Sequence, residues 1–106
     1  MSDKTTASEA RIIRDEWWDE VQLALTTLYA LAPLEHPNSP CLSVAVGTGL
    51  DPETGGTIPA CRGKVAGPDN EVKGFSANPT KEGLAVMQEV RGVLEQRLAA
   101  ATGEVH

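Results

Sequence analysis

Apolar and polar residues alternate with a helical period near both ends of the chain and with a strand period between them. Over residues 8–32, apolar residues recur every three or four positions, which is typical of a helix with a buried face. One row comprises Ile13, Trp17, Val21, Ala24, Leu28 and Leu31, and a second row beside it comprises Ile12, Trp18, Leu25 and Tyr29. Two rows predict two neighbours for this helix: the sheet, and either the C-terminal helix or another chain.

Local signals mark the ends of this helix. Thr6 and Glu9 form a T-x-x-E capping box, in which side chains satisfy backbone N–H groups of the first turn. Pro33 ends the helix, because the residue before a proline avoids the helical conformation. Residues 1–7 are polar for the most part and are expected to be disordered.

A second long helix is predicted over residues 79–101. Its apolar row comprises Leu84, Met87, Val90, Leu94 and Leu98. Asn78 or Thr80 is expected to cap the first turn with its side chain. Pro79 suits the first helical position, where no N–H is needed, and Gly103 is a typical stop.

Two glycines interrupt this second helix, Gly83 and Gly92. Each costs up to about 1 kcal/mol relative to alanine in a helix. We therefore expect that either of them marks a place where another backbone comes close.

Three strands are predicted between the helices, over residues 42–50, 57–65 and 71–76. Apolar and small residues alternate in the first of them. The connections, residues 51–56 and 67–70, are rich in Gly, Pro, Asp and Asn, which favour tight turns. The sequence thus predicts an α+β fold in one domain, residues 1–106, with a three-stranded antiparallel meander flanked by two long helices.

Composition and charge narrow the class of protein. The chain is 41% hydrophobic and 23% charged, which is typical of a globular domain. It has neither an apolar run of membrane-spanning length nor a signal-peptide pattern, so we expect a cytoplasmic protein that does not associate with membranes. The net charge of −6 argues against direct nucleic-acid binding, which needs a basic face.

No catalytic motif is found, so we expect a protein that is not an enzyme and holds no cofactor. The segment GTGLDPETGG lacks the Lys-Ser/Thr ending of a phosphate-binding loop, and no helix follows it. No serine lies in a G-x-S-x-G turn. Cys41, Cys61, His36 and His106 lack the spacing of metal ligands, so we expect two reduced thiols and no metal site.

A candidate protein-binding site lies in the first half of the N-terminal helix. It combines an aromatic pair with four acidic residues, namely Asp15, Glu16, Trp17, Trp18, Asp19 and Glu20. Adjacent helix residues point about 100° apart, so we expect one tryptophan in the core and the other as an interface anchor. The acidic rim suits a partner protein with a basic surface. The surplus apolar surface also predicts self-association, as a homodimer through this helix.

A second candidate site is basic. Arg62, Lys64, Lys73 and Lys81 fall within twenty positions. If the second and third strands pair across residues 67–70, Lys64 and Lys73 come near one another. This alternative is a small module that binds a nucleotide or another phosphate ligand.

The order helix–strand–strand–strand–helix resembles the double-stranded RNA-binding domain, in which the third strand runs into a last helix that opens with lysines. The segment GFSANPTKEGLAVM occupies that place here, with Lys81 as its helix-opening lysine. This resemblance implies RNA binding as a further alternative.

The overlapping passage KGFSANPTKEGLAVMQEV also looks like small phage-encoded inhibitors, such as type I-F anti-CRISPR proteins. That resemblance implies a non-enzymatic protein that acts by binding. The expected function is therefore that of a protein-binding inhibitor or adaptor, encoded by a phage or mobile element, that blocks a host defence complex.

Overall fold

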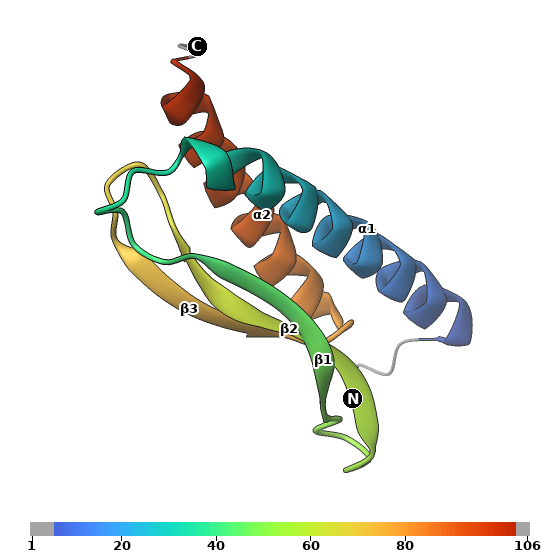
Figure 1. Cartoon of the computed structure of the whole chain (residues 1–106). Coiled ribbons are helices and arrows are strands. Elements are labelled where there is room, and N and C mark those ends of the chain that lie inside the picture. Colours follow the sequence, from blue (N-terminus) through green and yellow to red (C-terminus); the bar gives the residue numbers. More distant parts are fainter. Residues whose placement is uncertain (1–5, 104–106) are drawn as a thin grey trace.

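A computed structural model describes residues 6–103. It has two helices and a three-stranded antiparallel sheet, so the predicted α+β fold and its element order are confirmed (Figure 1). In chain order the elements are α1 (Ala7–Leu31), the short 3-10 helix η1 (Ala32–Leu34), β1 (Ser43–Leu50), β2 (Thr57–Ala66), β3 (Val72–Ala77) and α2 (Lys81–Thr102).

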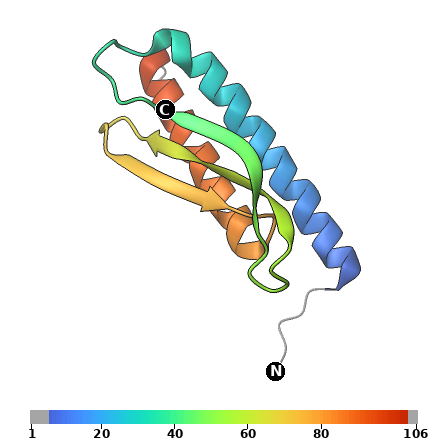
Figure 2. The ribbon, with the colours of Figure 1, turned by 60° about the horizontal axis from the view of Figure 1, so that its bottom comes forward.

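The two helices lie side by side on one face of the sheet and run in the same direction (Figures 1 and 2). The strand order is β1-β2-β3, so β2 is central and, in the part of the chain that the structure describes, both outer strands have an unpaired edge. Within residues 6–103 nothing covers the opposite face of the sheet (Figure 2). The result is a two-layer arrangement with extents of 47 × 26 × 22 Å.

The register decides which side chains face the helices, because directly opposed residues of neighbouring strands point to the same face. Cys61 is paired with Val46 on one side and with Ala77 on the other, and these positions face the helices. Arg62 is paired with Ala45 and Ser76, and these positions face away from them.

The core lies between the helices and this inner face of the sheet. The largest fully buried side chains are Trp17, Val21, Leu31, Cys61, Met87 and Leu94. They come from the first predicted row of α1, from β2 and from the predicted row of α2, as the helical period requires. α2 packs along α1, but the second predicted row of α1 is covered only in part: Trp18 and Leu25 are half-buried, while Ile12 is 56% and Tyr29 77% exposed.

Helix ends follow the expected chemistry, with two corrections. Thr6 caps α1 by accepting a hydrogen bond from the Glu9 N–H at 3.1 Å, and Ala7 is already helical, so the prediction of disorder over residues 1–7 is wrong at these two positions. Residues 1–5 lie outside the described residues.

Thr80 caps α2, which begins at Lys81; Pro79 therefore precedes the cap and is not the first helical residue. Gly103 ends α2 with φ 76°, as expected.

The two glycines of α2 have different environments. A Cβ on Gly83 would lie 1.6 Å from the carbonyl oxygen of Asn78, so this glycine does mark a close backbone approach. A Cβ on Gly92 would meet nothing within 4 Å. The expectation for these glycines thus holds at Gly83 only.

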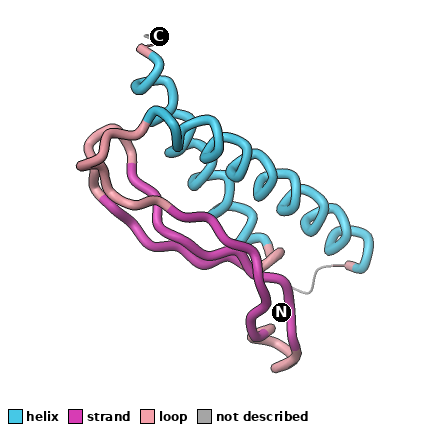
Figure 3. Tube along the Cα trace, viewed as in Figure 1, coloured by secondary structure: helices cyan, strands magenta, loops and turns pink. Residues whose placement is uncertain are grey.

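A buried arginine joins three separate parts of the chain. Arg97 of α2 is 6% exposed and donates from Nε and Nη2 to the two carboxylate oxygens of Glu35, at 2.6 and 3.0 Å. Its Nη1 also donates to the Gly67 carbonyl oxygen at 2.6 Å and to Asn70 Oδ1 at 2.8 Å. Arg97 thereby fixes the segment after η1 and the β2–β3 turn against α2, at the end of the molecule where these loops gather (Figure 3).

Candidate functional site

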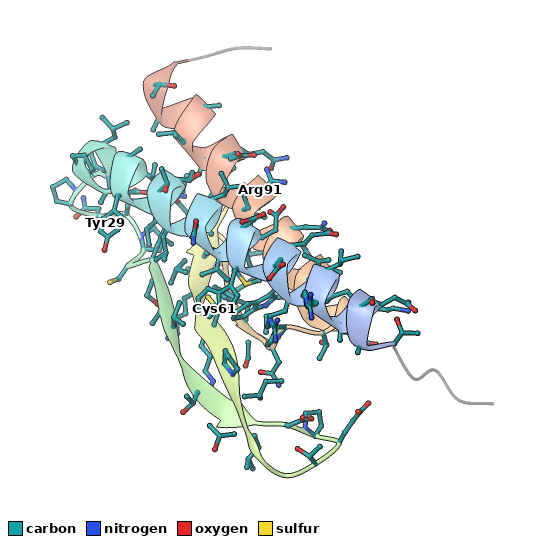
Figure 4. The ribbon with its side chains drawn as sticks, turned by 90° about the vertical axis from the view of Figure 1, so that its right-hand side faces the viewer. Tyr29, Cys61 and Arg91 are labelled. Carbon is teal, nitrogen blue, oxygen red and sulfur yellow. The ribbon has the colours of Figure 1, made fainter. Side chains whose placement is uncertain are left out.

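The acidic half of α1 presents its carboxylates to solvent. Asp15, Glu16 and Asp19 are exposed, and within residues 6–103 none of them takes part in an ion pair. Glu20 differs from them, since it is half-buried and bound to the Arg91 guanidinium of α2. Figure 4 shows Arg91 on the side of α2 next to α1. The acidic site of the sequence therefore divides into three free carboxylates and one structural carboxylate.

The tryptophan pair is divided in the same way. Trp17 is 0% exposed and belongs to the core, while Trp18 is half-buried and packs against it. The two rings meet edge to face, with centroids 5.0 Å apart and planes at 78°. Trp18 is thus the only ring of this pair that a partner can touch.

Two exposed aliphatic side chains lie on α1 at positions that the sequence analysis did not include in the protein-binding site. Ile12 is 56% exposed and Leu23 is 46% exposed. Together with Glu16 and Asp19 they follow the spacing i, i+4, i+7 and i+11, so all four share one face of α1. We call this set, Ile12, Glu16, Asp19 and Leu23, the outer row of α1. The signal for Leu23 was present in the sequence, because this apolar residue belongs to neither predicted row.

The basic set is not brought together on one face. Arg62 and Lys64 are exposed two positions apart on the outer face of β2. Lys73 is opposite Val65, which is buried, so Lys73 belongs to the face that carries the helices. The prediction that the Lys64 and Lys73 side chains lie near one another is therefore wrong. Lys64 is opposite Gly74, and the two lysines point to opposite faces of the sheet. Lys81 lies apart from them, at the start of α2.

Two hollows mark the surface. The first, about 690 Å³, runs between β3 and α2; its apolar lining includes Val65, Phe75, Val86, Val90 and Val93, and its charged lining is Asp69, Glu71, Lys73 and Glu89. We call it the β3–α2 groove. The second, about 1210 Å³, lies between the N-terminal half of α1, the β1–β2 turn and the start of α2, and Lys81 lines it. Neither hollow is lined by Arg62, Lys64, Asp15 or Asp19.

The two cysteines occupy different environments. Cys41 is exposed, whereas Cys61 lies on β2 beneath the helices and is fully buried (Figure 4). Burial raises the pKa of the Cys61 thiol to about 11, because the thiolate would lose its hydration. Within residues 6–103, no group of three or more His, Cys, Asp or Glu side chains is placed to hold a metal ion.

We expect the two thiols to differ in reactivity with Ellman's reagent at neutral pH. Only a thiolate attacks the reagent, so Cys41 should react fast and Cys61 only as the protein opens. The native protein should show one fast group, and the protein unfolded without reductant should show two. No free group in the unfolded monomer, or zinc in stoichiometric amount, would contradict this expectation.

The family models, the curated proteins and the solved structures contain no match to this chain. Among the described residues, neither helix combines the length and apolar character needed to cross a bilayer.

Proposed function

We propose that this protein acts by binding a partner protein with a basic surface through the outer row of α1, without turning over a substrate. One observation carries the proposal: exposed carboxylates at Glu16 and Asp19, free of ion pairs within residues 6–103, stand between exposed Ile12 and Leu23 on the same helix face. Apolar contacts hold a complex together, and charges around them steer its formation. Asp15 borders this face, whereas Trp18 points away from it, because it packs against the core and adjacent helix residues point about 100° apart.

The narrower form of the proposal is an inhibitor from a phage or mobile element that blocks a host defence complex. Such complexes bind nucleic acid through basic surfaces, and an acidic helix face could occupy such a surface. Self-association through the same row is opposed by like charges, since each copy would bring Glu16 and Asp19 to the interface. The row therefore favours a foreign basic partner over a second copy.

The test first isolates the partner protein by pull-down from a cell lysate and then compares paired variants in their binding to it. Asp19→Lys should slow association and flatten its salt dependence, whereas Glu53→Lys, the same charge change on the exposed β1–β2 turn, should not. Leu23→Ala should weaken binding about tenfold, mainly through faster dissociation. Surface plasmon resonance at two salt concentrations separates these effects. Light scattering of the free protein tests whether it forms the homodimer that the apolar surface of the helix predicts and that the like charges of the outer row oppose.

The alternative function gives the opposite result. Arg62 and Lys64 share the outer face of the sheet, where both are exposed, and they would bind a phosphate group or an acidic protein. If the partner is retained by Asp19→Lys and Leu23→Ala but lost by Arg62→Glu, the outer row of α1 is not the site. The outer face of the sheet then takes its place.

A further inference from the structure

The β3–α2 groove runs along an unpaired backbone edge. Among residues 6–103, β3 is paired with β2 only, so the N–H and C=O groups on its other edge have no partner strand there. Residues 73, 74, 75 and 76 all line the groove, although successive side chains of a strand point to opposite faces. A hollow that touches four successive residues follows the strand's backbone and not just one of its faces.

A wall of valines stands beside this edge. Val86, Val90 and Val93 of α2 are spaced i, i+4 and i+7, so they form one row along the groove. Phe75 of β3 extends the apolar lining and is half-buried. No β1 residue lines either of the two hollows.

The charges around the groove select the kind of ligand. Its lining contains three carboxylates, Asp69, Glu71 and Glu89, against one cation, Lys73. An extended ligand that carries positive charge is thus electrostatically complementary to the groove.

We propose that the β3–α2 groove binds an extended basic peptide, which adds to β3 as a fourth strand. Unpaired edges are templates for a further strand: main-chain hydrogen bonds supply affinity, and contacts to alternate side chains supply specificity. Apolar side chains of the peptide lie on the valine row, and its positive charges are attracted to the carboxylates around the groove. This site is separate from the outer row of α1 and does not depend on it.

The probe is the acetylated and amidated peptide KVKVKVK, with EVEVEVE and a fully N-methylated KVKVKVK as controls. By fluorescence anisotropy the first should bind and the other two should not, because one has the wrong charge and the other cannot donate main-chain hydrogen bonds. Binding should slow amide hydrogen exchange at least tenfold within residues 72–77 and leave residues 43–50 unchanged. Equal binding of all three peptides, no binding of KVKVKVK, or protection that appears on β1 instead, overturns the proposal.

Variants locate the site independently of the proposed function. Val93→Lys should weaken KVKVKVK binding at least tenfold, and Val46→Lys, a matched change at a 43% exposed position on β1, should not. Glu89→Lys, at an exposed helix position, tests the charge without touching the apolar wall and should weaken binding several-fold. Asp19→Lys should leave peptide binding unchanged. If Val93→Lys and Glu89→Lys both bind like the wild type, the groove is not the site.

Discussion

Replacing Arg97 by methionine should lower the free energy of unfolding by about 3 kcal/mol or more, on the scale of breaking a buried ion pair by removing one partner. Arg97 is 6% exposed and makes four hydrogen bonds to Glu35, Gly67 and Asn70. The substitution keeps most of the buried side-chain volume but leaves these acceptors without their donor. Urea denaturation followed by circular dichroism measures the loss.

Arg91 supplies the matched control. It also contacts two carboxylates, Glu20 and Glu95, but its side chain is 28% exposed. Exposed ion pairs contribute about 0–1 kcal/mol, so Arg91→Met should cost less than about 1 kcal/mol. An equal loss of unfolding free energy in Arg97→Met and Arg91→Met would show that burial does not set how much each arginine contributes to stability.

The Arg97 variant should also change how stability depends on pH. Its hydrogen bonds hold the pKa of the Glu35 carboxyl below the ordinary value of 4.5. A carboxyl with a lowered folded-state pKa stabilises the protein above its unfolded pKa, and this contribution is lost as the pH falls through the folded value. The loss of stability below pH 4.5 should therefore be shallower in Arg97→Met than in the wild type. Parallel pH profiles would contradict this assignment.

Gly83→Ala should destabilise the protein by about 2 kcal/mol, although alanine is the better helix former. The new Cβ would lie 1.6 Å from the Asn78 carbonyl oxygen and 3.0 Å from the Asn78 nitrogen. The segment 78–80 would have to move, and with it the Thr80 hydroxyl that accepts a hydrogen bond from the Gly83 N–H at 3.0 Å.

Gly92→Ala is the control in the same helix. Nothing lies within 4 Å of the added Cβ, so the gain in helix propensity should appear as up to about 1 kcal/mol of extra stability. Thermal and urea unfolding of both variants measure the two effects. The same sign for both would show that the close approach at Gly83 has no energetic consequence.

The parts of the fold that depend on local periodicity could be predicted from the sequence. The first apolar row of α1 identified Trp17 and Val21 as core, and the Gly and Asp content of the connections located the turns. The sequence offers more than one start for α2, since Asn78, Pro79 and Thr80 all suit a helix start. Only the geometry of the chain selects Thr80, whose side chain accepts the hydrogen bond.

Features that depend on register or on distant residues could not be predicted in the same way. A shift of a single position in a strand moves a side chain to the other face, so the grouping of Lys73 with Arg62 and Lys64 depended on a register that the sequence did not define. The partners of Arg97 are 62 residues away at Glu35 and 27 residues away at Asn70. No local pattern identifies such a contact.

The parallel direction of α1 and α2 has a consequence for folding during synthesis. Three strands separate the helices, so α1 packs along an element that is made only after the whole sheet, and the Glu20–Arg91 contact spans 71 residues. The face of α1 that carries Trp17 and Leu31 lacks its cover from α2 until α2 has left the ribosome. Contacts of such sequence separation slow folding and lengthen the time for which apolar surface is exposed to chaperones and to other chains.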